Sequence, residues 1–361
     1  MPAAGPGFPS IRLLIVDDSS TVRAILRAML SGEKEIAVVG EAVNGREAVA
    51  LTERLRPDVV LMDIRMPVMD GREATEEIMA ACAVPIIVFS SLTHGEEART
   101  SIDMLATGAL DVIAKPDLSD PHAVEECSRM LVRKIRTASK VAVIRHLRGR
   151  MRKPPSFRDI QAGGPEKPYA ALGIGSSTGG PAALRELLSR LPAGFPLPVL
   201  LVQHITFGFS RGFVEWLQQY TPLSVRLADA VDKAAPGTVL IAPEGRQMEV
   251  FPGGAVRAVS SRPKGVHLPS VDVLLSSMAG AYGRKGIGVL LTGMGADGVE
   301  GLGEIRRSGG LTIAQNEESS VVFGMPGEAI RQGAAELVMT PEGMADFLLS
   351  ITEQPLGIGE A

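Results

Sequence analysis

From Ile11 to about Arg145 the chain alternates short apolar runs with amphipathic segments. Five runs have the length and composition of buried strands: Ile11–Val16, Ala37–Val39, Val59–Met62, Ile86–Phe89 and Asp111–Ile113. The segments between them, such as Thr21–Leu30 and Gly71–Ala81, have the apolar pattern of helices. Strands that alternate with helices are typical of a doubly wound parallel sheet. We therefore predict a five-stranded parallel α/β domain over residues 11–145.

A second α/β pattern begins at Tyr169. Apolar strands are expected over Ala170–Gly175, Val199–Gln203 and Ile287–Leu291, and a helix with proline near its first position over Pro181–Arg190. We predict a doubly wound, mainly parallel α/β domain over residues 169–352. The remaining ends, residues 1–10 and 353–361, are predicted to be a disordered N-terminus and a C-terminal tail.

The stretch between the two patterns is basic and contains helix breakers. Between Arg133 and Arg158 there are ten Lys or Arg and no acidic residue, and Pro154-Pro155 and Gly163-Gly164-Pro165 follow one another closely. We interpret residues 146–168 as an exposed interdomain linker, with a docking surface for an acidic partner as the alternative. Nucleic-acid binding is disfavoured, because no helix-turn-helix pattern follows and no aromatic residues are interleaved for base stacking.

Composition agrees with two domains of this class. The chain has 361 residues, of which 45% are hydrophobic and only 4% aromatic, which is enough for two cores and favours α/β packing. The net charge of −4 gives no reason to expect nucleic acid or an anionic membrane as a partner. Two cysteines form no disulfide or metal motif, and neither a signal-peptide pattern nor an apolar run of membrane-spanning length occurs. We therefore expect a reduced cytoplasmic protein that does not insert into membranes.

Polar residues follow the predicted strands of the first domain where ligands of such sheets bind. They are Asp17 and Asp18 after the first strand, Asp63 after the third, Ser90 after the fourth and Lys115 after the fifth. Three carboxylates at one sheet edge repel each other unless a hard cation such as Mg²⁺ lies between them. One carboxylate could then attack a phosphoryl donor, with the lysine and the serine binding the phosphoryl oxygens. Any single aspartate could instead be a turn residue or a helix N-cap.

These residues lie in segments that resemble two-component receiver domains of flavodoxin-like fold. The segments are Val16-Asp17-Asp18-Ser19, Met62-Asp63-Ile64-Arg65-Met66-Pro67-Val68-Met69-Asp70-Gly71 and Lys115-Pro116. The resemblance implies that a histidine kinase phosphorylates Asp63 and that Asp18 and Asp63 are among the Mg²⁺ ligands. Many receivers carry an aromatic residue three positions before the lysine as a conformational switch, whereas this chain has Val112.

The second domain opens with a serine in a tight turn between strand and helix. The turn, Gly175-Ser176-Ser177-Thr178-Gly179, has G-x-S-x-G spacing, which places a serine on a sharp bend at a helix N-terminus. A dinucleotide-binding loop is disfavoured because Thr178 occupies the place of its last glycine, and a phosphate-binding P-loop because no lysine is present.

Two further strand ends supply the partners that a serine nucleophile needs. His204 follows the strand Val199–Gln203, and Asp297 lies in the loop after the strand Ile287–Leu291. The three residues could converge as a triad, in a chain order that differs from that of the α/β-hydrolases. Alone, His204 could be a structural strand-end histidine and Asp297 a turn residue before Gly298.

The region from about Tyr169 to Pro341 resembles the chemotaxis protein-glutamate methylesterase/glutaminase family. The matching segments are Gly175-Ser176-Ser177-Thr178-Gly179-Gly180-Pro181, Gln203-His204, Pro269-Ser270-Val271-Asp272-Val273-Leu274, Leu291-Thr292-Gly293-Met294-Gly295-Ala296-Asp297-Gly298 and Val322-Phe323-Gly324-Met325-Pro326. The resemblance implies Ser177 as nucleophile, His204 as base and Asp297 as orienting acid. It also implies an oxyanion hole from the backbone amides of Thr178 and Met294.

The two resemblances together imply a phosphorylation-activated hydrolase for sensory adaptation. Its substrates would be methyl-accepting chemoreceptors, its phosphodonor a chemosensory histidine kinase and its cofactor Mg²⁺ in the receiver, with no metal at the esterase site. The chain has Ile205-Thr206 where many members have methionine and proline, and Leu268 where an arginine is common. Because both places are expected to border the substrate groove, a phosphorylation-gated carboxylesterase acting on a non-receptor substrate stays open. A non-enzymatic output module that binds a partner is the third possibility.

Overall fold

The computed structural model describes residues 10–91, 96–141, 169–260 and 267–352, which belong to two compact units. Each unit is treated by itself. The predicted linker at 146–168, the tail at 353–361 and all but Ser10 of the predicted N-terminal segment lie outside the described residues. The domain limits therefore stay predictions.

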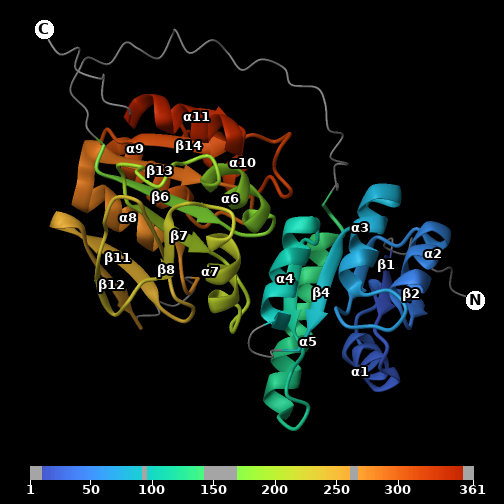
Figure 1. The fold of residues 1–361 in the computed structure, drawn as a ribbon. Coiled ribbons are helices and arrows are strands. Elements are labelled where there is room, and N and C mark those ends of the chain that lie inside the picture. Colours follow the sequence, from blue (N-terminus) through green and yellow to red (C-terminus); the bar gives the residue numbers. More distant parts are fainter. Residues whose placement is uncertain (1–9, 92–95, 142–168, 261–266, 353–361) are drawn as a thin grey trace, which may run out of the picture. The chain divides into compact units, whose positions relative to one another are not determined.

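The first unit is a five-stranded parallel sheet with strand order β2-β1-β3-β4-β5, which confirms the predicted doubly wound receiver fold (Figure 1). Helix α1 contacts α5, and α3 contacts both α2 and α4, as expected for helices on the two faces of such a sheet. Its strands are β1 (Ile11–Val16), β2 (Ile36–Ala42), β3 (Val59–Met62), β4 (Ile86–Ser90) and β5 (Asp111–Ala114). Its helices are α1 (Ser20–Leu30), α2 (Gly45–Leu55), α3 (Gly71–Cys82), α4 (Glu96–Thr107) and α5 (Pro121–Ala138).

The residues at the start of α3 hold the backbone of Asp63 in place. Asp70 is the N-cap of this helix, and its carboxylate accepts the amide hydrogen of Glu73 at 2.8 Å. The next residue must be glycine, because a Cβ at Gly71 would lie 2.0 Å from the carbonyl oxygen of Asp63. The Gly71 amide in turn donates to the Ile64 carbonyl at 2.8 Å. The helix therefore packs directly against the backbone that carries Asp63.

The second unit contains a seven-stranded parallel sheet in the order β15-β14-β13-β6-β7-β10-β8 (Figure 1, green to red). Its strands are β6 (Ala171–Ser176), β7 (Val199–Gln203), β8 (Ser224–Leu227), β10 (Thr238–Ile241), β13 (Gly286–Leu290), β14 (Leu311–Gln315) and β15 (Leu337–Met339). The helices are α6 (Gly180–Leu188), α7 (Ser210–Gln218), α8 (Val271–Tyr282), α9 (Val299–Arg307), α10 (Met325–Arg331) and α11 (Pro341–Thr352). Short 3-10 turns occupy Pro252–Gly254 and Gly283–Lys285. The predicted mainly parallel α/β fold is confirmed, with strand limits within one residue of those expected for β6, β7 and β13.

A small antiparallel sheet in the second unit was not predicted. It has the order β11-β12-β9, formed by β9 (Val231–Lys233), β11 (Gln247–Phe251) and β12 (Ala255–Val259). Its buried residues Met248 and Val250 of β11 and Val256 of β12 pack into the same hydrophobic core as the apolar faces of α8 and α9. Within the described ranges, no helix has the length and apolar character needed to cross a membrane.

Helix α8 approaches the sheet closely at the end where the polar loops gather. A Cβ at Gly175 would lie 2.1 Å from Cγ1 of Val271, and one at Gly173 would lie 2.4 Å from the sulfur of Met278. Gly298, with φ of +95°, meets the same Val271 side chain. The first residue of α8 is thus packed between the end of β6 and the loop before α9, and this places the amides of α8 beside that loop.

Candidate functional site

The predicted acidic pocket of the first unit forms at the carboxyl edge of its sheet. Asp17 and Asp63 are buried, Asp18 is exposed, and ligand oxygens of the three lie within 4.8 Å of one another. Lys115 Nζ donates to Asp17 Oδ2 at 2.8 Å and to Asp63 Oδ1 at 2.9 Å. Ser90 is buried at the end of β4, where its hydroxyl donates to the Ser91 carbonyl at 3.3 Å. The structure therefore brings the three carboxylates and the lysine together.

The charge balance of this pocket suits a divalent cation. Burial raises the pKa of Asp63 to about 6, and the positive charge and hydrogen bond of Lys115 only partly oppose this effect. Three carboxylates with oxygen atoms this close are a hard ligand set of the kind that Mg²⁺ prefers, so the donor chemistry fits that ion. Val112, at the place where many receivers carry an aromatic residue, is buried in β5.

Asp63→Asn is expected to stabilise the first unit in metal-free buffer, and more so as the pH rises. Because the pKa of Asp63 is raised in the fold from 3.8 to about 6, the wild type loses stability as the pH rises through this window. The shift corresponds to an upper limit of about 3 kcal/mol. Hydrogen exchange of the β3 amides, compared between mutant and wild type at pH values from about 4 to about 7, measures the difference. A difference that does not change over this interval would contradict the expectation.

The second unit contains two adjacent serines that differ in their environment. Ser176 ends β6, is 0% exposed, and its hydroxyl donates to Gln203 Oε1 at 2.6 Å. Ser177 is half-buried in the turn, its amide donates to the Thr292 carbonyl at 3.1 Å, and its hydroxyl has no partner in the described part of the chain. Gly179, with φ of +78°, completes the bend into α6. Of the two hydroxyls, only that of Ser177 is left available for chemistry.

The predicted base and acid lie in direct contact. Nε2 of His204, just after β7, is 2.8 Å from Oδ2 of Asp297. The remaining ring nitrogen, Nδ1, is therefore the atom that could accept a proton from a serine. Ser177 Oγ and His204 form no hydrogen bond within the described ranges, so only two of the three residues are paired here. Catalytic hydrogen bonds are often long in a structure without substrate.

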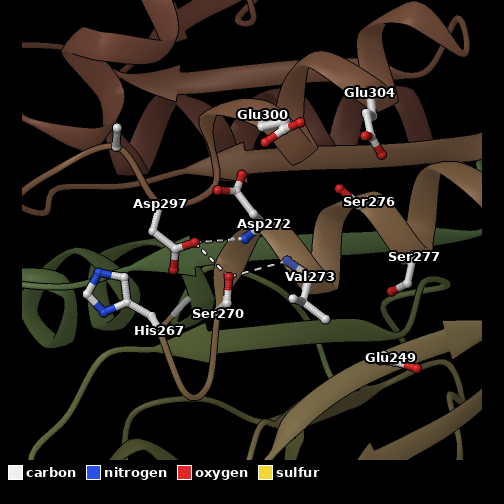
Figure 2. A pocket seen from close by; sticks show the side chains of 11 residues that line it. Glu249, His267, Ser270, Asp272, Val273, Ser276, Ser277, Asp297, Glu300 and Glu304 are labelled. Atoms are coloured by element: carbon white, nitrogen blue, oxygen red, sulfur yellow. Dashed lines mark hydrogen bonds between the residues drawn. The ribbon is translucent and has the colours of Figure 1, made fainter. Parts of the chain in front are cut away.

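The N-terminus of α8 holds the Asp297 carboxylate (Figure 2). Its oxygens accept the hydroxyl hydrogen of Ser270 at 2.7 Å and the amide hydrogen of Asp272 at 3.1 Å, both drawn in Figure 2. They also accept the amide hydrogen of Val271 at 2.8 Å. Burial alone would raise the pKa of Asp297, but the contact with His204 and these donors pull it well below its usual range. Burial instead raises the pKa of the neighbouring Asp272, although the Gly301 amide donates to its carboxylate at 2.9 Å. The pKa values of the two carboxyls therefore shift in opposite directions, with that of Asp297 lowered and that of Asp272 raised.

The amides expected to stabilise an oxyanion lie on two neighbouring loops. A Cβ added to Gly293 would be 2.8 Å from Cβ of Ser177, so the loop after β13 touches the serine turn. Within the described residues, neither the Thr178 amide nor the Met294 amide donates a backbone or side-chain hydrogen bond. The Met294 side chain is 42% exposed. Two unused donors therefore lie on the loops that flank the serine.

Sequence reasoning assigned no role to several residues of this site. The His267 ring stacks on that of His204, with centroids 4.6 Å apart. It lies with Ser270, Asp297 and the acidic residues Glu249, Asp272, Glu300 and Glu304 around a pocket of about 630 Å³ (Figure 2). Half-buried Leu268 follows His267. Ser270 could have been recognised as the N-cap of the helix it precedes, but nothing local connects it to Asp297, which is distant in sequence.

Comparison with known proteins agrees with both units. The family model described as "CheB methylesterase" matches residues 172–348, and that described as "Response regulator receiver domain" matches residues 13–123. A protein-glutamate methylesterase/protein-glutamine glutaminase of Anaeromyxobacter dehalogenans is 41% identical over 341 residues, covering 94% of this chain and 98% of the relative. One of Syntrophus aciditrophicus is 40% identical over 344 residues, with 94% and 98% covered.

One solved structure is similar to part of this chain. The crystal structure of the Thermotoga maritima CheB methylesterase catalytic domain is 35% identical in sequence, covers 51% of this chain and 98% of that chain, and has a TM-score of 0.49. The two relatives above match nearly end to end, through both the receiver and the hydrolase regions. The chain therefore belongs to the family of protein-glutamate methylesterase/protein-glutamine glutaminase enzymes that carry a response regulator receiver domain.

Proposed function

We propose that the chain is a phosphorylation-activated serine hydrolase that removes methyl esters from glutamates, and deamidates glutamines, on methyl-accepting chemoreceptors. The observation that carries this proposal is the His204–Asp297 contact of 2.8 Å, next to a turn whose serine hydroxyl is unengaged within the described residues. The relatives bear the names of both activities. Cytoplasmic location is part of the proposal and is supported by the two buried cysteines, neither of which is in a disulfide.

The proposed reaction is acyl transfer through an acyl-enzyme. Ser177 Oγ attacks the γ-carbonyl carbon of the modified glutamate while His204 Nδ1 takes its proton. The Thr178 and Met294 amides stabilise the oxyanion, and Asp297 stabilises the imidazolium. His204 then gives its proton to the methoxy oxygen as the C–O bond breaks and methanol leaves, or, when the substrate is glutamine, to the amide nitrogen as the C–N bond breaks and ammonia leaves. Water activated by the same histidine hydrolyses the acyl-enzyme and restores Ser177.

The receiver is proposed to control this activity through Asp63. A histidine kinase would be the phosphodonor, and Asp63 Oδ1 or Oδ2 the attacking atom. Asp18 and Asp63 would hold Mg²⁺, whose charge neutralises the transferring phosphoryl group. Lys115, already between Asp17 and Asp63, and Ser90 at the adjacent strand end would bind the phosphoryl oxygens. Phosphorylation would then shift the protein toward its active state.

Methanol release from membranes that contain methylated chemoreceptors tests substrate and regulation together. With Mg²⁺ and acetyl phosphate, the wild type is expected to release methanol faster than without the phosphodonor. Asp63→Asn removes the phosphoryl acceptor and is expected to release methanol at the same basal rate with or without acetyl phosphate. Equal wild-type rates under both conditions would contradict activation by phosphorylation. No wild-type release from a competent membrane preparation would contradict the receptor substrate.

The alternative substrate class rests on Leu268, which stands where many family members have an arginine and directly follows His267, a residue that lines the pocket. Loss of that cation would change how an anionic or polar substrate is bound. A panel comparing methylated receptor membranes with small carboxylic esters separates the two possibilities. Faster turnover of small esters at equal concentration would favour the non-receptor carboxylesterase.

A further inference from the structure

Gln203 connects the serine turn to the proposed catalytic histidine. It is the last residue of β7, is 4% exposed, and lies opposite Ser176 in the parallel β6–β7 pair. Its Nε2 donates to the carbonyl oxygen of Ser177 and to that of His204, both at 2.8 Å. Its Oε1 accepts the Ser176 hydroxyl hydrogen at 2.6 Å. One planar amide is therefore bonded to the backbones of both residues that must exchange a proton.

The orientation of this amide is determined by its partners. The two carbonyl oxygens can only accept, so the NH₂ group must face them, and the hydroxyl of Ser176 supplies the donor that Oε1 requires. The position of Gly180 is explained by the same network. A Cβ at Gly180 would lie 2.1 Å from Oε1 of Gln203, and the Gly180 amide donates to the Ser177 carbonyl at 2.9 Å. Both polar atoms of the buried side chain are thus hydrogen-bonded.

The backbone amides of Ser177 and His204 donate their hydrogen bonds to other residues. The His204 amide donates to the Ser176 carbonyl at 2.9 Å, and the Ser177 amide donates to Thr292. No direct hydrogen bond joins Ser177 and His204 in the part of the chain that the structure describes. The Gln203 amide is therefore the short polar connection between the two residues, and it acts on their backbones, without contact to the reacting atoms.

We propose that Gln203 is a positioning residue that sets the distance between the nucleophile Ser177 and the base His204. The inference rests on the proposed function, in which these two residues transfer a proton. A displacement of about 1 Å between reacting groups can cost about 100-fold in rate. Loss of the amide therefore lowers turnover, and it leaves substrate binding unchanged because Gln203 is buried behind the site.

The chain offers a matched control in Gln218 at the end of α7. Its Nε2 also donates to two carbonyls, those of Thr221 at 3.3 Å and Leu223 at 2.9 Å, and its Oε1 accepts the Val225 amide at 2.9 Å. Each glutamine therefore makes two donor bonds and one acceptor bond, although Gln218 is exposed and its Oε1 accepts a backbone amide, whereas buried Gln203 accepts a hydroxyl. Gln203→Glu and Gln218→Glu remove the same two donors, and only the first affects the serine turn.

The test compares both variants in the full chain, with kcat and KM for a methyl-ester substrate, the melting temperature, and the rate of labelling by a fluorophosphonate probe. Gln203→Glu is expected to lower kcat and the labelling rate about 10- to 100-fold while KM changes less than about twofold. Gln218→Glu removes equivalent donors at an exposed position and is expected to keep kcat within about twofold. Equal kcat in Gln203→Glu and wild type would overturn the proposal.

A milder variant keeps the test decisive if Gln203→Glu does not fold. Ser176→Ala removes the hydroxyl that orients the amide and leaves both carbonyl bonds available, so a loss of about fivefold in kcat is expected, with KM unchanged. Unchanged kcat in Ser176→Ala would contradict the positioning role of Gln203. Failure of the proposed function has a different signature, because the wild type itself would then neither hydrolyse the ester nor be labelled at Ser177.

Discussion

Ser177→Ala is expected to lower the rate of methyl-ester hydrolysis by about 1,000-fold or more, because it removes the atom that forms the acyl-enzyme. The residual rate would come from the oxyanion donors and substrate binding alone. The side chain is half-buried in the turn before α6 and its hydroxyl makes no hydrogen bond within the described residues, so its loss should hardly change stability. Stopped-time methanol assays with the phosphorylated protein measure the effect.

The adjacent serine supplies the control for this prediction. Ser176 is buried and its hydroxyl is committed to Gln203, so Ser176→Ala should lower kcat only about fivefold, against the loss of about 1,000-fold or more expected for Ser177→Ala. Intact-mass and peptide analysis after fluorophosphonate treatment should place the adduct on Ser177 in the wild type and in Ser176→Ala. An adduct on Ser176, or comparable losses in both variants, would show that the nucleophile is not Ser177.

The two serines also show what sequence can and cannot predict about this site. The G-x-S-x-G spacing pointed to Ser177 as the nucleophile. The apolar runs predicted the parallel strands after which Ser177, His204 and Asp297 lie. The reason that Ser176 is unsuitable is a hydrogen bond to Gln203 on a neighbouring strand. That bond arises from the pairing of β6 with β7 and leaves no local pattern in the sequence.

The environment of Asp297 was beyond sequence analysis for the same reason. Ser270 and Asp272 belong to a segment that resembled the family, yet their contact with Asp297 depends on how closely α8 approaches the sheet. Glycine at 173, 175 and 298 makes that approach possible. The antiparallel strands β9, β11 and β12 were also missed, since strands of three to five residues carry too little periodicity to be separated from loops.

In the first unit, sequence analysis predicted more of the site, because its residues lie at the ends of four strands, β1, β3, β4 and β5. A doubly wound sheet brings those ends to one edge, so the alternation of strands and helices was enough to group Asp17, Asp63 and Lys115. The effect of burial on Asp63 could not be predicted. The pKa of Asp63 depends on how deeply its carboxylate is buried. The close packing of Gly71 against the backbone carbonyl of Asp63 helps to set that depth.

Asp297→Asn is expected to lower kcat by about 1,000- to 10,000-fold with a smaller change in KM. The carboxylate accepts hydrogen from His204 Nε2, which leaves Nδ1 free to take the serine proton. An asparagine at this place can present its NH₂ group to Nε2, and the imidazole then carries its proton on Nδ1, where it cannot act as base. Loss of the negative charge also removes the stabilisation of the imidazolium that forms in the transition state.

The substitution should also lower stability, with a defined pH dependence. The pKa of Asp297 is depressed in the fold, so its contribution is fully present above the unfolded value of about 3.9 and is lost only as the pH falls below it. Asp232 is a control, because its carboxylate also accepts hydrogen bonds from a side chain, that of Arg226 at 2.8 Å, and from the backbone amides of Asp229 and Lys233. Its pKa is likewise lowered, to about 2.

Asp232→Asn should therefore reduce the melting temperature at neutral pH and leave kcat within about threefold of the wild type. Asp297→Asn should reduce both. If the two variants lost stability to a similar extent and also lost activity to a similar extent, the effect of Asp297 would be one of folding alone. Retention of wild-type kcat in Asp297→Asn would exclude the carboxylate from the mechanism, and His204 would then need another partner to hold its ring.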